Sequence, residues 1–223
     1  MTTSKTIVIA GTPVDTQMGV ALAQQADLPE PLFMPISRSP QEQNEMQYLE
    51  RDELQRVFEE KIIEGAKLGA DRVFLYCNSL STAVDYEGAS ARTGLPIVTP
   101  LETYTAWASR YSRLALIAAN SQAATGIEGH MRAQNPTLEL VALGLLPVVE
   151  AIEAQLPPAQ IVHDFKLGQL FDWFGELQPP FGPPEGIVLG CTHFPYIKEE
   201  LARHTSVPLL DPAATMLAEL AAL

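Results

Sequence analysis

The stretch at residues 187–193 reads Ile-Val-Leu-Gly-Cys-Thr-His, and it has an earlier counterpart at residues 73–79, Val-Phe-Leu-Tyr-Cys-Asn-Ser. Each begins as a short apolar run with the length of a buried strand and ends in a cysteine followed by small polar residues. Each therefore places its cysteine, Cys77 or Cys191, where a strand is expected to stop.

The correspondence continues downstream of both cysteines. Residues 96–100 read Pro-Ile-Val-Thr-Pro, and residues 208–212 read Pro-Leu-Leu-Asp-Pro at a similar spacing from the second cysteine. We interpret this pattern as a long internal repeat of two similar lobes. The only two cysteines of the chain are then expected at equivalent positions.

Length and composition are those of an ordinary globular protein. The chain has 223 residues, of which 47% are hydrophobic and 18% charged, which suffices for one large domain or two small ones. No apolar run reaches membrane-spanning length, and no basic and apolar signal segment opens the chain. We therefore expect a cytoplasmic protein with no membrane partner.

The net charge and the spacing of the cysteines argue against nucleic-acid and metal partners. The net charge of −13 argues against a nucleic-acid partner, because binding a phosphate backbone needs a cationic surface. The cysteines belong to no Cys-x-x-Cys pair and to no Cys/His cluster with zinc spacing, so a metal site has weak support. Free thiols are expected rather than a disulfide, since nothing suggests an oxidising compartment.

Strands alternate with helices along the chain, which predicts an α/β fold with parallel sheets covered on both faces. Residues 11–16 and 29–40 are expected to be loops, the second because it contains four prolines. Ser81 is available to cap a helix. The expected strands are residues 5–10, 73–76, 96–98, 114–118, 138–142 and 187–190, and the expected helices are residues 17–26, 41–68, 81–92, 101–110, 123–133, 148–155, 160–174, 195–204 and 212–223.

The placement of the cysteines suggests acid/base chemistry. Ligands of parallel sheets collect at the carboxyl ends of the strands, where Cys77 and Cys191 are expected. A thiol there, ahead of a helix, feels the positive end of the helix dipole, which favours the thiolate. Two such thiols across a cleft could take a proton from one face of a carbon and return one to the other, which inverts the centre. The alternative for either cysteine alone is a buried small hydrophobic residue.

Asp15 and Thr16 are expected just beyond the first strand. An aspartate or threonine ahead of a helix usually caps it, so spacing alone favours helix capping for Asp15. A functional role at the end of the strand is the alternative.

Residues 189–195, Leu-Gly-Cys-Thr-His-Phe-Pro, resemble the second-cysteine signature of the glutamate racemases, within the cofactor-independent, two-cysteine aspartate/glutamate racemase superfamily. Residues 77–79, Cys-Asn-Ser, resemble the first signature, Cys-Asn-Thr. Weaker matches follow in the order of that family over nearly the whole chain. They are Asp15-Thr16, Ala119-Asn120-Ser121, Leu-Pro-Val-Val-Glu at residues 146–150, and Asp211-Pro212-Ala213.

The resemblance implies two pseudo-symmetric lobes, each a mainly parallel sheet flanked by helices, with the active site between them. Residues 1–100 plus 209–223 would form the first lobe, and residues 101–208 the second. Cys77 and Cys191 would be the catalytic acid/base residues. Asp15, His193 and Glu150 are implied as their charged or polar assistants, and Thr16, Asn78, Ser79, Thr192 and Asn120 as substrate-binding residues.

Two of these residues have structural alternatives, and one segment departs from the family. His193 could make only a local hydrogen bond at a helix start, although its place two residues after Cys191 favours a functional role. Glu150 could complement a helix dipole. The family's Pro-Tyr-Gly is replaced at residues 35–39 by Pro-Ile-Ser-Arg-Ser, in which Arg38 could bind a carboxylate or lie on the surface.

The resemblance thus implies a PLP-independent racemase of an acidic amino acid, aspartate or glutamate, that needs no cofactor or metal and transfers protons at Cα between two thiols. One alternative is an isomerase that uses Cys77 as a covalent nucleophile, like maleate isomerase. Another is a non-catalytic ligand-binding relative. The oligomeric state is left open, with a homodimer as one alternative.

Overall fold

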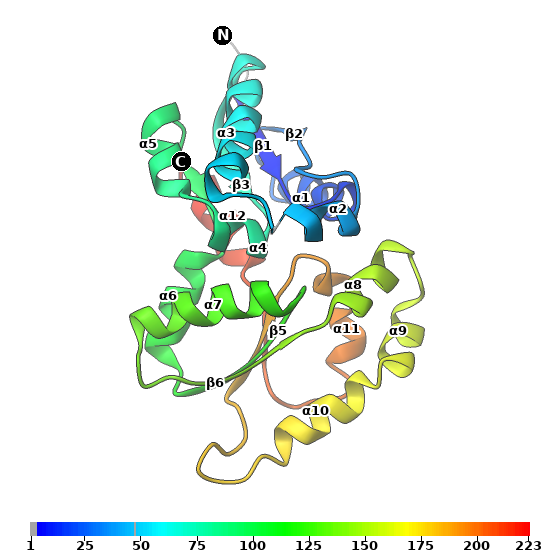
Figure 1. Cartoon of the computed structure of the whole chain (residues 1–223). Helices are drawn as coiled ribbons and strands as arrows, with labels where there is room; N and C mark the ends of the chain where they lie inside the picture. Colours follow the sequence, from blue (N-terminus) through cyan, green and yellow to red (C-terminus); the bar gives the residue numbers. More distant parts are fainter. Residues whose placement is uncertain (1–3, 47) are drawn as a thin grey trace. The chain divides into compact units, whose positions relative to one another are not determined.

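The computed structural model describes residues 4–46 and 48–223, and its chain divides into two compact units (Figure 1). The first unit consists of Met1–Leu101 with Ala213–Leu223, and the second of Glu102–Pro212. The second unit extends to Pro212 rather than to residue 208, because Leu209–Leu210 pairs with a strand of that unit.

The first unit contains a four-stranded sheet in which all neighbouring strands are parallel, in the order β2-β1-β3-β4. The strands are β1 (Lys5–Ile9), β2 (Glu30–Phe33), β3 (Ala70–Leu75) and β4 (Ile97–Val98). Its helices are α1 (Pro13–Gln25), α2 (Pro40–Met46), α3 (Arg51–Lys67), α4 (Asn78–Ala83), α5 (Tyr86–Thr93) and α12 (Ala213–Ala221).

Helices cover both faces of this sheet. Gly19 in α1 lies against Val8 and Tyr76, whereas Gly65 in α3 lies against Ile7, whose side chain points to the opposite face. The absence of a side chain at both glycines lets each helix pack closely on the strands. The first unit therefore has a helix–sheet–helix layering.

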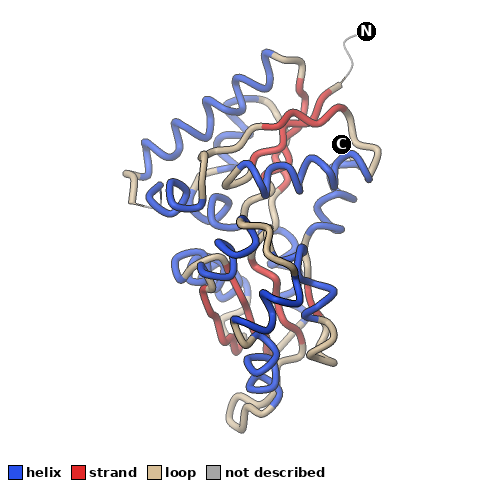
Figure 2. The backbone as a smooth tube through the Cα atoms, turned by 90° about the vertical axis from the view of Figure 1, so that its right-hand side faces the viewer, coloured by secondary structure: helices blue, strands red, loops and turns tan. Residues whose placement is uncertain are grey.

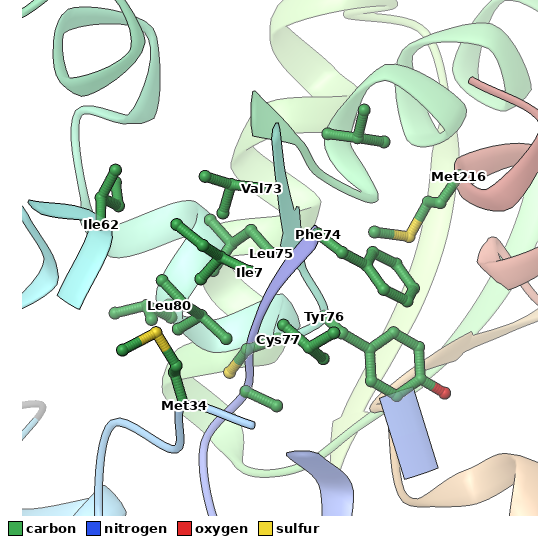
Figure 3. Packing of buried hydrophobic residues seen from close by; sticks show 14 of the residues in the cluster. Ile7, Met34, Ile62, Val73, Phe74, Leu75, Tyr76, Cys77, Leu80 and Met216 are labelled. Carbon is green, nitrogen blue, oxygen red and sulfur yellow. The ribbon is translucent and has the colours of Figure 1, made fainter. Parts of the chain in front are cut away.

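The alternation of side chains along β3 continues into the residue that follows it (Figure 3). Phe74 and Tyr76 point to one side, toward Met216 of α12, and their rings lie 5.0 Å apart. Leu75 and Cys77 point to the other side. Cys77 therefore prolongs the row of buried side chains that anchors the strand.

The second unit repeats this topology, with a parallel sheet in the order β6-β5-β7-β8. The strands are β5 (Arg113–Ala118), β6 (Glu139–Gly144), β7 (Gly186–Gly190) and β8 (Leu209–Leu210). Its helices are α6 (Leu101–Arg110), α7 (Ser121–Gln134), α8 (Leu146–Glu153), α9 (Pro158–Asp164), α10 (Leu167–Gly175), η1 (Phe194–Ile197) and α11 (Lys198–Leu201).

This sheet is also covered on both faces, and Figure 2 shows the strands of each unit running among helices. Gly190 lies against Leu116 and Ile127 of α7, on one face. Ala115 and Ile117, on the other face, belong to a core cluster with buried side chains of α8, α9 and α10. Two parallel sheets, each flanked by helices, confirm the predicted α/β class.

β2 lies in a segment that the sequence analysis predicted to be loop. It forms the edge of its sheet and pairs with β1 alone. Pro31 is tolerated there because a proline lacks the N–H group that a central strand needs for its second neighbour. The proline-rich composition therefore indicated an edge strand rather than the absence of a strand.

Several helices differ from their predicted limits. The helix expected at residues 41–68 is two helices, α2 and α3, and the one expected at residues 160–174 is broken at Lys166, which has a φ of 55°. Residues 195–204 form the short η1 and α11. The helix expected at 17–26 begins earlier, at Pro13. Within the described chain, no helix combines the length and apolar character needed to cross a membrane.

Ser81 does not cap a helix, contrary to the prediction. Residues 81–92 form parts of two helices, α4 and α5, and Ser81 lies inside α4 with its hydroxyl donating to the Cys77 carbonyl at 2.7 Å. Cys77 itself occupies the N-cap position of α4. The N-cap of α5 is Asp85, whose carboxylate accepts from the Gly88 N–H at 2.8 Å.

Candidate active site

The strand order places each cysteine at the point where its sheet changes direction of winding. In the first sheet the chain moves outward from β1 to β2 and then returns to β3 on the other side of β1. The second sheet does the same with β5, β6 and β7. Such a switch point, at the carboxyl ends of the two central strands, is where open α/β sheets bind ligands. Cys77 follows β3 and Cys191 follows β7, so the two cysteines occupy equivalent positions.

Cys77 is buried, with 2% of its surface exposed, and two polar side chains reach its sulfur. The Gln43 Nε2 lies 3.5 Å from the Cys77 Sγ, and the Ser79 Oγ lies 3.4 Å from it. The Gln43 Nε2 also donates to the Ser79 Oγ at 3.3 Å. Carboxamide, hydroxyl and thiol therefore form a closed triangle without a charged member.

Gln43 is a residue of this site that the sequence analysis missed. It lies on α2, 34 positions before Cys77, and its carboxamide rests against Gly11 beyond the end of β1. A single glutamine in a polar segment carries no signal of such a contact. The one local cue is the start of α2, where the Ser39 hydroxyl accepts from the Glu42 N–H at 3.1 Å.

Asp15 is buried in the first turn of α1 and takes part in helix capping, but it is not the N-cap. Thr12 is the N-cap, and Asp15 is the third helical residue of a capping box. The Asp15 carboxylate accepts from the Thr12 N–H at 2.7 Å, the Thr12 hydroxyl at 3.0 Å and the Gly11 N–H at 3.2 Å. The Thr16 hydroxyl donates to the Thr12 carbonyl at 2.6 Å. Asp15 thus fixes the loop that follows β1.

Asn78 is buried next to Cys77. In the segment at residues 35–39, which replaces Pro-Tyr-Gly, one polar side chain is buried and another lies at the surface. Ser37 is buried, and its N–H and hydroxyl both donate to the Gly11 carbonyl. The Arg38 side chain is 90% exposed and pairs with Glu42. Through its hydrogen bonds, Arg38 holds the pKa of the Glu42 carboxyl below its usual range. The structure thus gives Arg38 a surface ion pair.

Cys191 is buried at the end of β7 and has a different set of neighbours. The Cys191 Sγ lies 3.5 Å from the His193 Nδ1, and the His193 Nε2 lies 2.6 Å from the Glu153 Oε1. His193 is 2% exposed, and the Glu153 side chain is 14% exposed. A carboxylate, an imidazole and a thiol therefore form a chain of contacts.

Glu153, rather than Glu150, is the carboxylate in contact with His193. Both residues lie on α8, but Glu150 is exposed whereas Glu153 is partly buried. The two are three positions apart, so they lie on neighbouring parts of the same helical surface. The role expected for Glu150 stays a prediction, and Glu153 is an additional carboxylate that the sequence analysis did not single out.

The remaining predicted residues lie around the second switch point. Asn120 is the N-cap of α7, where its side-chain oxygen accepts from the Ala123 N–H at 2.9 Å. Thr192, which lies between Cys191 and His193 in the sequence, has a buried side chain. Asp211, just beyond β8, accepts from the Lys198 ammonium at 3.0 Å.

These features agree with a comparison of the chain with protein families. The family model described as Asp/Glu/Hydantoin racemase matches residues 16–220. The chain belongs to this family. The match includes both cysteines, His193 and Glu153.

Among curated proteins, the glutamate racemase of Desulforudis audaxviator (strain MP104C) is 31% identical to this chain over 159 residues. The matched stretch covers 66% of this chain and 53% of that protein. The chain therefore spans about half the length of the curated relative that it matches.

Solved structures of racemases share the fold at low identity. A glutamate racemase from Francisella tularensis in complex with D-glutamate has a TM-score of 0.77 at 17% identity, covering 100% of this chain and 81% of that chain. An allantoin racemase from Klebsiella pneumoniae has a TM-score of 0.61 at 16% identity, covering 99% and 87%. The fold of this chain thus resembles both a glutamate racemase and an allantoin racemase.

Proposed function

We propose that this protein is a racemase of an acidic amino acid, glutamate or aspartate, and that it works without a cofactor through the thiols of Cys77 and Cys191. The observation that carries the proposal is the equivalent placement of the two cysteines at the switch points of two like sheets. Membership of the Asp/Glu/hydantoin racemase family supports it.

The proposed reaction is a proton transfer on each face of the α-carbon. One cysteine, as thiolate, takes the α-proton and becomes a thiol, which leaves a carbanion stabilised by the adjacent carboxylate. The other cysteine, as thiol, gives its proton to the opposite face and becomes the thiolate. Each turnover therefore exchanges the protonation states of the two cysteines, and the reverse reaction starts from the state that the forward reaction leaves.

The neighbours of each sulfur suit these roles. A nearby donor favours the thiolate because it hydrogen-bonds the charged form, and Gln43 and Ser79 can donate to Cys77. His193 can do the same for Cys191, with Glu153 fixing the imidazole and balancing its charge. In this proposal Asp15 shapes the loop beside Cys77, and Glu153 takes the assisting role that the sequence suggested for Glu150.

Thr16, Asn78, Ser79, Asn120 and Thr192 are proposed to hold the substrate, as the family resemblance implied. They lie in the segments that follow β1, β3, β5 and β7, the central strands of the two sheets. Hydroxyl and carboxamide groups can donate to a carboxylate and accept from an ammonium group. The substrate would thus be recognised by neutral groups, which leaves proton transfer to the thiols.

An exchange experiment tests the proposal. The protein is incubated in deuterium oxide with each enantiomer of glutamate and aspartate, and the α-proton signal is followed by NMR together with chiral chromatography. Appearance of the opposite enantiomer with deuterium at the α-carbon supports the proposal. Absence of exchange with all four substrates would refute an acidic amino-acid racemase.

A ring substrate is the second candidate, because the family description includes hydantoins and the structural neighbours include an allantoin racemase. Allantoin and a 5-substituted hydantoin therefore belong in the same exchange panel. Exchange with these compounds alone would keep the two-thiol chemistry and overturn the acidic substrate.

A further inference from the structure

The side chain of Gln43 lies at the first switch point, where it contacts the Cys77 sulfur. Its carboxamide contacts three residues from two separate segments: Gly11 beyond β1, and Cys77 and Ser79 at the start of α4. An amide nitrogen carries two hydrogens, so it can donate to the Cys77 Sγ and the Ser79 Oγ at once.

The Ser79 hydroxyl completes the arrangement. When its oxygen accepts from Gln43, its own hydrogen is free to point to the Cys77 sulfur, 3.4 Å away. The sulfur then accepts two hydrogens, one directly from Gln43 and one from the serine that Gln43 orients. Donors aimed at a sulfur stabilise its anionic form over its neutral form.

We propose that Gln43 is a positioning residue that holds the Cys77 sulfur in its proton-accepting state, by donating to it directly and by turning the Ser79 hydroxyl toward it. The inference rests on the proposed function, in which Cys77 alternates between thiolate and thiol. An amide suits this task because it does not titrate, so the proton that Cys77 takes stays on the sulfur.

Gly11 offers a way to displace Gln43 without changing its chemistry. The three heavy atoms nearest to a Cβ built on Gly11 all belong to the Gln43 carboxamide, and that Cβ would overlap with them. Gly11 does not have a positive φ, so alanine is allowed by its backbone. The flexible end of Gln43 is therefore what must move in Gly11→Ala.

The native charged groups near this end of the sheet are kept in every variant below, and Gln43→Glu alone adds a charge. Asp15 on α1 is engaged by the N–H groups of Gly11 and Thr12, and Glu42 on α2 is paired with Arg38 at the surface. Differences in the titration of Cys77 therefore report on Gln43.

The test is a titration of the single thiol left in Cys191→Ser, followed by its thiolate absorbance in the ultraviolet. Gln43→Met keeps the length of the side chain and removes both donors, and it should raise the pKa of Cys77 by about one unit. Gly11→Ala should do the same, and the double variant should add nothing further. Gln43→Glu should raise the pKa more than Gln43→Met, since it places a like charge beside the sulfur.

The matched control is Gln41→Met, at an exposed position of the same helix, which should leave the titration unchanged. Circular dichroism checks that each variant is folded. An unchanged titration in folded Gln43→Met, or a shift in Gln41→Met as large as in Gln43→Met, would overturn the inference.

With both cysteines present, Gln43→Met should lower kcat/KM about tenfold near neutral pH, and the loss should shrink as the pH rises and the thiolate forms without help. The titration does not depend on turnover. If the thiol titration shifts as expected but no compound in the exchange panel reacts, the proposed function fails while the role of Gln43 stands. If racemisation is found but the titration of Cys77 does not change in Gln43→Met, the proposed function stands and the role of Gln43 fails.

Discussion

Cys77 and Cys191 follow equivalent strands of two sheets with the same order, yet their neighbours differ in kind. The Cys77 sulfur meets a carboxamide and a hydroxyl, whereas the Cys191 sulfur meets an imidazole that is bound to a carboxylate. In both units the distinguishing residue comes from the helix after the outer strand: Gln43 from α2 after β2, and Glu153 from α8 after β6.

This difference indicates how the two halves of a repeat can diverge. The strand order places the thiols, and the helices after β2 and β6 supply the side chains in which their surroundings differ. One end of the proposed reaction then has a carboxamide and a hydroxyl beside its sulfur, and the other has an imidazole that contacts a carboxylate. The predictions below test whether Cys77 and Cys191 contribute equally to the proposed reaction and whether each depends on its own set of neighbouring residues.

The largest expected effect comes from removing either sulfur. Cys77→Ser and Cys191→Ser should each lower kcat/KM for racemisation by about 10³-fold or more, because a hydroxyl hardly ionises near neutral pH and general acid–base catalysis is lost at that face. The equilibrium constant of a racemisation is one, so the loss must be equal in both directions. Chiral chromatography of the reaction in each direction measures the loss of kcat/KM. A variant that retains a rate near that of the wild type would show that its cysteine is not an acid/base residue of the reaction.

The next effect concerns the end that is supported by His193. Glu153→Gln removes the carboxylate that holds the imidazole and should lower kcat/KM by on the order of 10²-fold. Glu150→Gln, on the exposed part of the same helix, should cost much less. Steady-state kinetics of the two variants decide between them, and a larger loss at Glu150 would contradict the assignment made from the contact.

A smaller effect, on stability, should distinguish Gly190, which precedes Cys191, from Gly11, which contacts Gln43. A Cβ on Gly190 would lie 2.6 Å from Leu116 Cδ1, 2.9 Å from Ile127 Cδ1 and 3.2 Å from the Ile117 carbonyl. Gly190→Ala should therefore cost about 1–3 kcal/mol of unfolding free energy through overpacking. Gly11→Ala should cost less, since it meets a movable side chain, and urea unfolding of the two variants compares them. Equal costs would show that Gln43 is held as firmly as the core of the second unit.

The smallest expected effect is at a surface ion pair of the first unit. Arg92 and then Gln55 hydrogen-bond Glu59, and this holds the pKa of the Glu59 carboxyl below its ordinary value of 4.5. A carboxyl with a lowered pKa contributes stability above its ordinary pKa and loses that contribution as the pH falls through the lowered value.

Arg92→Met should therefore destabilise the protein slightly at neutral pH, and the difference from wild type should vanish in acid. Urea midpoints measured across the acidic range test this. The titration of Cys77 should not change, and a change would mean that surface charge contributes to the thiol's surroundings.

The sequence was sufficient for the fold class because apolar runs and turn residues are local signals. The matched stretches ending in Cys77 and Cys191 predicted two parallel sheets, and the strand at residues 97–98 was placed to within a residue. The strand at residues 209–210 was not among the expected strands, although the repeat matched this segment to residues 96–100. β2 was missed because an edge strand tolerates proline, which reads locally as loop. The breaks within the predicted helices were missed because apolar periodicity continues across them.

The site was harder to predict from the sequence than the fold, because its main contacts join residues that are far apart in the chain. Which residue of α8 meets His193 depends on how that helix packs on the sheet, so the contact of Glu153 could not be read from the motif at residues 146–150. The contact of Gln43 with Cys77 spans 34 positions and has no motif. Residues next to a strand end could be predicted, whereas those delivered by the neighbouring helix could not.

The measurement that tests the central claim most directly is the early time course of isotope exchange in deuterium oxide, starting from one pure enantiomer. If two different thiols serve the two faces, the product receives its α-hydrogen from a solvent-exchanged thiol, so it carries deuterium from the first turnovers while the recovered substrate retains its protium. If deuterium instead enters recovered substrate and product together from the start, a single base serves both faces and the account of two cysteines is contradicted.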